Sequence, residues 1–200
     1  MRLKKGEAFF EAVSNPARPF VVVAGHREVT AIGTAFSVRY EPDHLAVMLV
    51  EGKVAVASTV PARGFSGLSG HESAGPRSSD DPENLGAGTV TLVPGQRLVF
   101  AGNRPPRLDT PRVEAVTAWR RGEVVLDKVT LADAVAEMNR YDRTRLVIDD
   151  PRVASLRVSG IYHTGDSAGF ARAIGNIYDL TVSREGDRIH LRESFGTGTD

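Results

Sequence analysis

The chain has 200 residues, of which 41% are hydrophobic, so it is long enough to bury a core in one large domain or two small ones. Its 25 lysine and arginine residues balance its 25 aspartate and glutamate residues, so no net positive charge favours nucleic acid or an anionic membrane surface as a partner. The absence of cysteine excludes disulfides, thiolate metal sites and cysteine nucleophiles.

No stretch of the sequence has the pattern of a membrane helix. The longest apolar runs, such as FVVVA at 20–24, are far shorter than the roughly 18 residues that cross a bilayer. The first residues, MRLKKGEAFFEAV, lack the apolar centre and the small-residue cleavage site of a signal peptide. We therefore expect a soluble protein, or a soluble part of a larger one, without a membrane span.

The first half of the chain alternates apolar and polar residues, with Gly and Pro between short runs, from residue 5 to about 114. This pattern predicts an all-β domain over residues 1–118, folded as a sandwich, a barrel or a solenoid. The expected strands are, in order, EAFFEAV, FVVVAG, EVTAIG, AFSVRY, LAVMLVEG, KVAVAS, GTVTLV and RLVFAG.

Residues 61–88 interrupt this strand pattern. They are rich in Gly, Ser, Pro and Asp and poor in large apolar side chains, so they offer little burial to offset the entropy of ordering. Strand signals resume directly afterwards, at Thr89. We expect a mobile, protease-sensitive and largely dispensable insertion between two strands.

After Trp119 the pattern changes to a mixture of helices and strands. Thr130 and Asp133 have the spacing of a capping box, and they precede a helical apolar face formed by Leu131, Val135 and Met138. The predicted helix ends near Tyr141. RLVID and LRVSGIY then read as strands.

A second helix is expected in DSAGFARAIGNIY, with Phe170, Ile174 and Ile177 on one face. LTVSR and RIHLR follow as a hairpin around Gly186 and Asp187, a pair suited to a tight turn. Residues 119–200 are therefore predicted to form a small α+β module of the β-α-β-β-α-β type.

The sequence offers no motif for a metal or a cofactor. The histidines lack the spacing of a zinc pair, and they stand at positions 26, 44, 71, 163 and 190. GFSGLSGH at 64–71 departs from a nucleophile elbow, and GAGT at 86–89 lacks the third glycine and the helix of a dinucleotide site. We expect neither a cofactor nor a metal.

Adjacent charged residues have ordinary structural interpretations. The pairs Asp80-Asp81 and Asp149-Asp150 each stand beside a proline, where aspartate typically supports a turn. Arg120 and Arg121 could bind an anion, but adjacent arginines beside an aromatic residue are more typical of a solvated face. None of these residues indicates that the protein is an enzyme.

Several motifs occur in an order that resembles the FecR family over residues 3–141. They are GEAFFEAV at 6–13, RPFVVVAG at 18–25, VTAIGTAFSVR at 29–39, LVPGQ at 92–96, WRRGEVVL at 119–126 and NRY at 139–141. In addition, residues 123–193 are similar to the small secretin and TonB N-terminal (STN) module.

The FecR resemblance implies a periplasmic signalling region rather than an enzyme. Members of that family regulate iron-uptake sigma factors through a cytoplasmic anti-sigma segment, one inner-membrane helix and a periplasmic sensor. The implied partner is the N-terminal signalling domain of a TonB-dependent outer-membrane receptor. The anti-sigma segment and the membrane helix are missing from this sequence, so a sigma factor would be contacted only through that missing segment, and Met1 would be an added or chosen start.

The resemblance also draws attention to Gly33 and Thr34, because the matching Gly-Thr pair is a self-cleavage site in some FecR-type regulators. Chemically, the Thr34 hydroxyl could attack the preceding carbonyl, and glycine can hold a strained peptide. The alternative interpretation is a bend between sheet layers, a common role of an isolated glycine in a strand. Both interpretations remain open, and the sequence identifies no base.

Two other functional classes remain open besides the signalling module. One is a small-molecule binder or enzyme built on a β-barrel, which would require convergent polar side chains on the strands. The other is a secretin-like assembly module, which would predict self-association of the C-terminal half.

Overall fold

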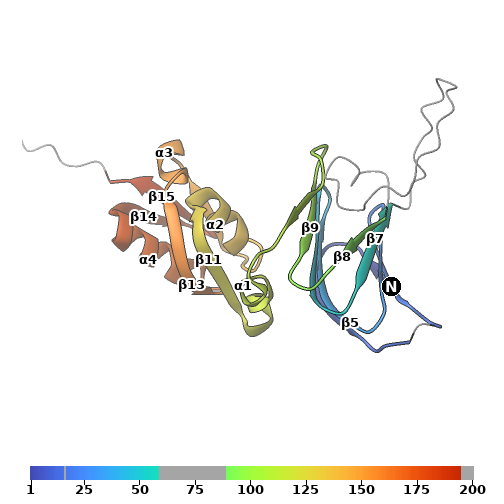
Figure 1. The fold of residues 1–200 in the computed structure, drawn as a ribbon. Coiled ribbons are helices and arrows are strands. Elements are labelled where there is room, and N and C mark those ends of the chain that lie inside the picture. Colours follow the sequence, from blue (N-terminus) through green and yellow to red (C-terminus); the bar gives the residue numbers. More distant parts are fainter. Residues whose placement is uncertain (16, 59–88, 195–200) are drawn as a thin grey trace, which may run out of the picture. The chain divides into compact units, whose positions relative to one another are not determined.

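The computed structural model describes residues 1–15, 17–58 and 89–194. The chain forms two compact units, Met1–Val113 and Glu114–Asp200, so the division lies slightly before residue 118. The first unit is built of β-strands and the second mixes helices with strands (Figure 1). The predicted fold class is confirmed. The predicted insertion at 61–88 lies outside the described residues.

The first unit contains two five-stranded sheets within its described residues. One sheet has the strand order β1-β3-β4-β7-β8 and the other has the order β10-β9-β6-β5-β2. The strands are β1 (Arg2–Leu3), β2 (Gly6–Ala12), β3 (Phe20–Ala24), β4 (Arg27–Ala31), β5 (Thr34–Glu41), β6 (His44–Glu51), β7 (Val54–Ser58), β8 (Val90–Leu92), β9 (Arg97–Ala101) and β10 (Arg107–Asp109).

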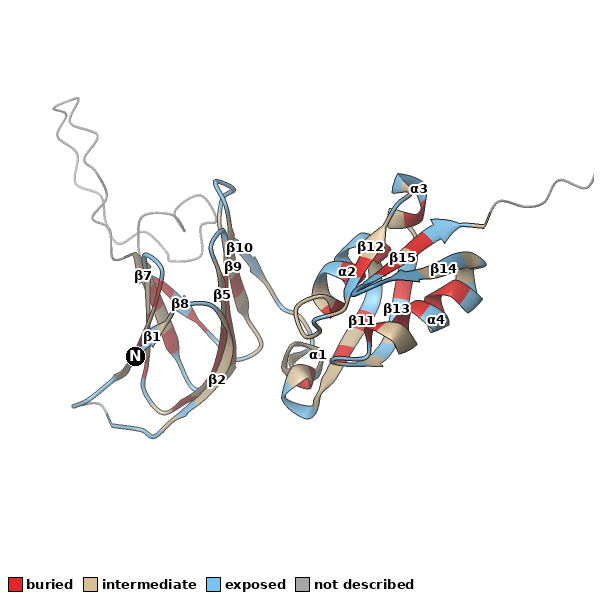
Figure 2. Ribbon diagram, turned by 180° about the vertical axis from the view of Figure 1, so that it is seen from behind, coloured by how far each residue is buried: buried red, intermediate tan, exposed pale blue. Residues whose placement is uncertain are grey.

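The two sheets of the first unit face each other across one hydrophobic core. Alternate residues along the strands point inward, and the residues of this core lie between the sheets (Figure 2). Val22 and Val29 from one sheet and Phe36 and Leu98 from the other are all fully buried. Of the three architectures that the sequence allows, the structure is the sandwich.

An aromatic cluster closes the side of this core at the edge strand β2. The ring centroids of Phe10 lie 5.4 Å from Phe20 and 5.2 Å from Phe36. Phe10 and Phe36 are register partners on β2 and β5, while Phe20 belongs to the opposite sheet. The cluster therefore stabilises β2 against both layers.

The second unit has ten elements within its described residues. They are α1 (Val113–Thr117), the short 3₁₀-helix η2 (Ala118–Arg121), β11 (Glu123–Thr130), α2 (Leu131–Met138), β12 (Arg145–Ile148), α3 (Pro151–Ala154), β13 (Arg157–His163), α4 (Ser167–Tyr178), β14 (Leu180–Glu185) and β15 (Arg188–Glu193). β11 pairs with β13, and the other strands form a sheet of order β12-β15-β14.

Helices α2 and α4 pack against the strands in the core of the second unit. The predicted cap of α2 is present, because the Asp133 amide donates to Thr130 Oγ1 over 3.1 Å. Leu131, Val135 and Met138 are buried, as the helical pattern predicts.

The prediction for α4 was wrong at one position, because Ile177 is 63% exposed. The buried face of α4 passes instead through Phe170, Ile174 and Gly175. Gly175 brings the helix close to β14, where an added Cβ would lie 2.7 Å from Val182 Cγ2. A glycine contact carries no hydrophobic signal, so the apolar pattern pointed to Ile177 instead.

Three local features complete the comparison with the sequence. Helix α1 begins before Trp119, where the pattern predicted only strands, and Gly122 ends η2 with φ 74°. Helix α3 follows Asp150, whose side chain accepts from the Arg152 amide over 2.9 Å, so this aspartate is an N-cap rather than a simple turn residue. The predicted β14–β15 hairpin is confirmed, with Gly186 at φ 62°.

Candidate functional site

Gly33 and Thr34 lie where the chain passes from one sheet of the first unit to the other. Strand β4 ends at Ala31 in the first sheet, and β5 begins at Thr34 in the second. Gly33 has φ +63°, and an added Cβ there would lie 2.8 Å from Ser14 Cβ. The bend therefore requires glycine, both for its backbone conformation and for the close approach of Ser14.

A second crossing of the chain packs directly against this bend. After β6 the chain returns to the first sheet through Gly52 and Lys53, and β7 begins at Val54. Thr34 Oγ1 donates a hydrogen bond to the Lys53 carbonyl over 3.0 Å. Gly52 has φ +88°, and a Cβ there would lie 2.4 Å from the Gly33 carbonyl oxygen. Thr34 is 3% exposed, so the Lys53 carbonyl satisfies its buried hydroxyl, and this hydrogen bond joins the two crossings.

This geometry defines what the Gly33-Thr34 bond can do chemically. The Thr34 hydroxyl follows the bond directly and donates its proton to the Lys53 carbonyl, so this hydrogen bond must break before the hydroxyl can lose its proton in an attack on the Gly33 carbonyl. A carbonyl oxygen cannot accept the hydroxyl proton as a base. The described contacts of Thr34 include no such base.

The free edge of β14 is the second candidate feature. Leu191 on β15 uses its carbonyl to bind the Asp149 amide beyond β12 over 3.2 Å, so its backbone faces away from β14. Its register partner on β14 is Val182. In an antiparallel pair of this kind, the Val182 amide and carbonyl point outward, where no described strand pairs with them.

The opposite edge of the same sheet is covered. On β12, the Leu146 amide donates to Asn139 Oδ1 over 2.7 Å, and the Leu146 carbonyl accepts from Asn139 Nδ2 over 2.9 Å. One side-chain amide thus replaces a neighbouring strand there. β14 is accordingly the edge of this sheet whose backbone groups are available to a partner strand.

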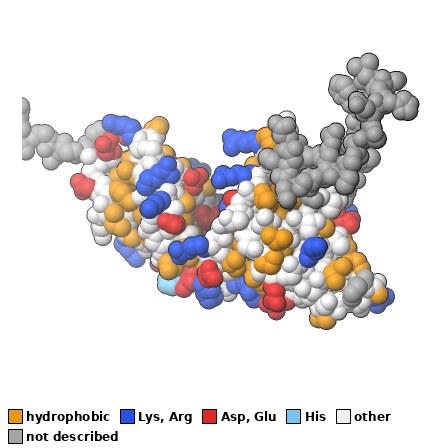
Figure 3. All heavy atoms as spheres, in the orientation of Figure 1, with side chains coloured by type: hydrophobic (Ala, Val, Ile, Leu, Met, Phe, Trp, Pro, Cys, Tyr) orange, Lys and Arg blue, Asp and Glu red, His pale blue; other side chains and the backbone are white. Residues whose placement is uncertain are grey.

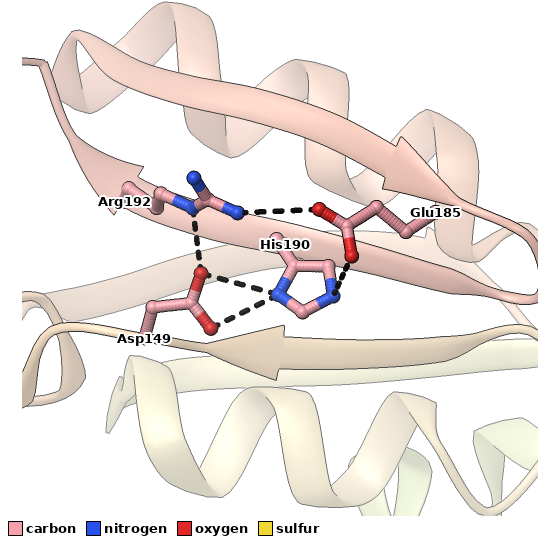
Figure 4. A network of polar contacts seen from close by, with 4 residues as sticks. All are labelled: Asp149, Glu185, His190 and Arg192. Carbon is pink, nitrogen blue, oxygen red and sulfur yellow. Dashed lines mark hydrogen bonds and ion pairs between the residues drawn. The ribbon is translucent and has the colours of Figure 1, made fainter.

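A ring of four charged or polar side chains ties β14 to the rest of the sheet (Figure 4). Asp149 accepts from His190 Nδ1 over 2.9 Å and from Arg192 Nε over 2.6 Å. Glu185 on β14 completes the ring at 3.9 Å from His190 Nε2 and 3.6 Å from Arg192. Both Glu185 contacts are too long for hydrogen bonds, and the one to Arg192 contributes mainly charge attraction.

The ring also places Ser183 beside His190, as register partners on β14 and β15. Serine, histidine and aspartate are the residue types of a hydrolase triad, but Ser183 Oγ has no hydrogen-bond partner among the described residues. The serine-to-histidine contact that activates a nucleophile is therefore not made.

Because of this ring, the free energy of unfolding should depend on pH. Hydrogen bonds from His190 and then Arg192 lower the pKa of Asp149. A lowered folded-state pKa contributes stability above the ordinary aspartate pKa of about 3.9, and this contribution is lost as pH falls through the lowered value. Asp149→Asn should therefore be less stable than the parent protein at pH 7, with a difference that shrinks below about pH 4.

Urea unfolding midpoints at pH 7 and pH 3 would measure this effect. The matched control is Asp127→Asn on β11, because the exposed Asp127 side chain has no hydrogen bond or ion pair with the described residues. A difference between Asp149→Asn and the parent protein that stays constant with pH would contradict the assignment.

The remaining candidates from the sequence are dispersed. Arg121 forms an exposed ion pair with Glu123 over 3.2 Å, and Arg120 is exposed. His71, Asp80 and Asp81, with the GFSGLSGH and GAGT motifs up to residue 88, lie outside the described residues. Within residues 1–15, 17–58 and 89–194, no group of three or more His, Cys, Asp and Glu side chains could hold a metal ion.

Charge and hydropathy add two observations. On the face shown in Figure 3, basic and acidic side chains are interspersed over each unit. None of the described helices is both long enough and apolar enough to cross a membrane.

Comparison with known proteins supports both the family motif and the fold. Residues 1–55 match the sequence model of the family described as FecR protein. A crystal structure of a putative anti-sigma factor from Parabacteroides distasonis ATCC 8503 has a TM-score of 0.68 at 21% identity, over 95% of this chain and 78% of that chain. A second crystal structure with the same description gives 0.67 at 21% identity over the same shares. No curated protein matches the chain.

Proposed function

We propose that this chain is the periplasmic signalling region of a FecR-type regulator. It binds the N-terminal signalling domain of a TonB-dependent outer-membrane receptor and so controls an extracytoplasmic-function sigma factor of the iron or siderophore uptake type. The observation that carries the proposal is the FecR match over residues 1–55. The similarity of the fold, over 95% of this chain, to a structure described as a putative anti-sigma factor supports it.

In this proposal the two units have different family relationships. The first is the FecR-type all-β domain, and the second is an STN-like module in which two helices pack on small sheets. The full-length protein is anchored in the inner membrane, and the sigma factor is contacted through a cytoplasmic segment that this sequence does not contain.

The uncovered edge of β14 suits such a partner. Strand β14 has six residues, four of them exposed, and its register with β15 is continuous. A partner strand added there would gain main-chain hydrogen bonds without disturbing the sheet. We place the receptor domain at this edge.

Titration calorimetry tests the binding itself. The purified chain should bind the signalling domain of its cognate receptor, identified from the genetic neighbourhood, with neither a cofactor nor nucleic acid present. A receptor signalling domain from an unrelated system is the control. If both proteins are folded and no heat of binding appears at high micromolar concentrations, the signalling role is wrong.

The proposed edge predicts the effect of a proline. Val182→Pro removes an outward amide and places a ring on the docking edge, so it should weaken binding by about tenfold or more while the chain stays folded. Val182→Thr keeps the amide and nearly the same shape, and it should bind like the parent protein. If Val182→Pro and Val182→Thr bind the receptor domain with equal affinity, the partner does not bind at the β14 edge.

Self-cleavage between Gly33 and Thr34 is a second proposed property, favoured by the left-handed Gly33 and by the buried hydroxyl that follows it. Thr34 Oγ bonds to the Gly33 carbonyl carbon, the peptide C–N bond breaks, and the hydroxyl proton passes to the new amine. Water then hydrolyses the ester, which leaves a carboxylate at Gly33 and restores the Thr34 hydroxyl.

Denaturing mass spectrometry should then show two fragments that remain associated in native solution, because Ala12 and Thr34 are paired in one sheet across the cut. Thr34→Ala should abolish the cut, while Thr34→Ser, which keeps a hydroxyl, should permit it. If the mass stays intact after long incubation, in protein that still binds its receptor domain, the bond is not cleaved and Gly33 serves only to bend the chain.

A further inference from the structure

A groove of about 430 Å³ opens at one end of the β-sandwich of the first unit. Three hairpin turns meet there: β3–β4 from one sheet, and β5–β6 and β9–β10 from the other. The Gly102 amide donates to the Asp43 carbonyl over 2.7 Å, which fixes two of these turns to each other. Turns held on a rigid sandwich are a common place for a binding site.

The floor of the groove is apolar and well supported. Leu45 is 4% exposed, and its register partners on the two neighbouring strands are Tyr40 and Phe100, so all three side chains share one face. Gly25 has φ +58° and lies so close to Tyr40 that an added Cβ would be 2.7 Å from Tyr40 Oη. This contact joins the two sheets at the rim of the groove.

Arg27 forms the wall opposite. Its guanidinium carbon lies 4.1 Å from the centroid of the Phe100 ring, so the cation sits over this ring. The side chain is half-buried, and it has no hydrogen bond or ion pair with any described residue. Burial lowers the pKa of Arg27, yet a guanidinium stays protonated at neutral pH.

The other charges that line the groove favour an anion. Arg104 is exposed and lacks an ion pair with the described residues, and His26 and His44 add two imidazoles. Asp43 is the one carboxylate among the described residues of the lining, and it does not form an ion pair with Arg27. A half-buried cation without a carboxylate partner is costly, and binding an anion would offset that cost.

We propose that this groove binds a small organic carboxylate with an apolar body. The free edge of the Arg27 guanidinium pairs with the carboxylate, Arg104 adds a second cation, and the apolar body lies on Tyr40, Leu45 and Phe100. This site is separate from the β14 edge and does not depend on the proposed receptor binding.

Benzoate is a suitable probe, and neutral benzamide has the same shape without the charge. Titration of the full chain, followed through backbone amide shifts by NMR, should show benzoate binding with a dissociation constant on the order of 1 mM. The largest shifts should fall on Gly25, His26 and Arg27 and on Gly102 and Arg104. Benzamide should bind at least about tenfold more weakly.

Two variants and a control test which arginine binds the carboxylate of benzoate. Arg27→Gln should weaken benzoate binding about tenfold or more, and the exposed Arg104→Gln, which leaves the stacking intact, should weaken it less but measurably. Arg172→Gln on α4 removes one exposed arginine from the other unit and should change nothing. The proposal is overturned if benzoate and benzamide shift the same amides equally, if Arg172→Gln weakens binding as much as Arg27→Gln, or if the groove amides do not respond. Inorganic phosphate that binds as tightly as benzoate would overturn the apolar part of the proposal.

Discussion

Replacing Gly52 with alanine should destabilise the protein by about 3 to 5 kcal/mol. At φ +88°, an L-residue pays a backbone penalty of about 1–2 kcal/mol, and the new Cβ would lie 2.4 Å from the Gly33 carbonyl oxygen. That oxygen is backbone and cannot rotate away, so the two chain crossings must separate. The hydrogen bond from Thr34 to Lys53 would be lost with them.

Gly95→Ala is the matched control for this change. Gly95 has φ +87°, but an added Cβ there meets no atom within 4 Å, so only the backbone penalty of about 1–2 kcal/mol applies. Urea unfolding, followed by far-UV circular dichroism, measures both variants. If both lose the same stability, the two crossings are not packed as described.

Phe36→Ala should cost about 3–5 kcal/mol, which is the usual range for removing a fully buried phenylalanine. Phe36 is 0% exposed, and its ring packs 5.2 Å from that of Phe10 and 6.3 Å from that of Phe20. The cavity lies between the two sheets, where backbone hydrogen bonding limits collapse. The edge strand β2 should therefore loosen first.

Phe9→Ala provides the comparison for Phe36→Ala, because it makes the same substitution on the other face of β2. Phe9 is half-buried and pairs with Ser37, while the neighbouring Phe10 pairs with Phe36. The loss of stability should be roughly 1–2 kcal/mol, since the half-buried Phe9 side chain buries less apolar area than Phe36 and lies outside the core. The unfolding midpoints in guanidinium or urea measure both losses of stability. A loss for Phe9→Ala equal to that for Phe36→Ala would contradict the strand register of the sandwich.

The sequence predicted the helices and strands better than the tertiary contacts between them. Alternation located the strands, and the spacing of Thr130 and Asp133 located α2, because these signals are local. It missed α3, since Asp150 before a proline suits both a turn and a helix N-cap. It also misassigned Ile177, because the packing of α4 through Gly175 depends on how close β14 lies.

The candidate sites show the same limit. Gly33 could be singled out as an isolated glycine in a strand, but its dependence on Gly52 appears only when the chain after β6 crosses back to the first sheet, where β7 pairs with β4. Asp149 and His190 are 41 residues apart in sequence, and no spacing rule connects them. The placement of Arg27 against Phe100 likewise requires both sheets of the sandwich.

Hydrogen exchange of the backbone amides, measured on the chain alone and with the cognate receptor signalling domain, tests the central claim most directly. In the free chain, the outward amides of Leu180, Val182 and Arg184 on β14 should exchange quickly, because no described strand pairs with them. In the complex, the same amides should become protected, while those of Thr181 and Ser183, which face β15, should change little. A complex that leaves exchange along β14 unchanged, or the absence of any complex between two folded proteins, would contradict the proposal.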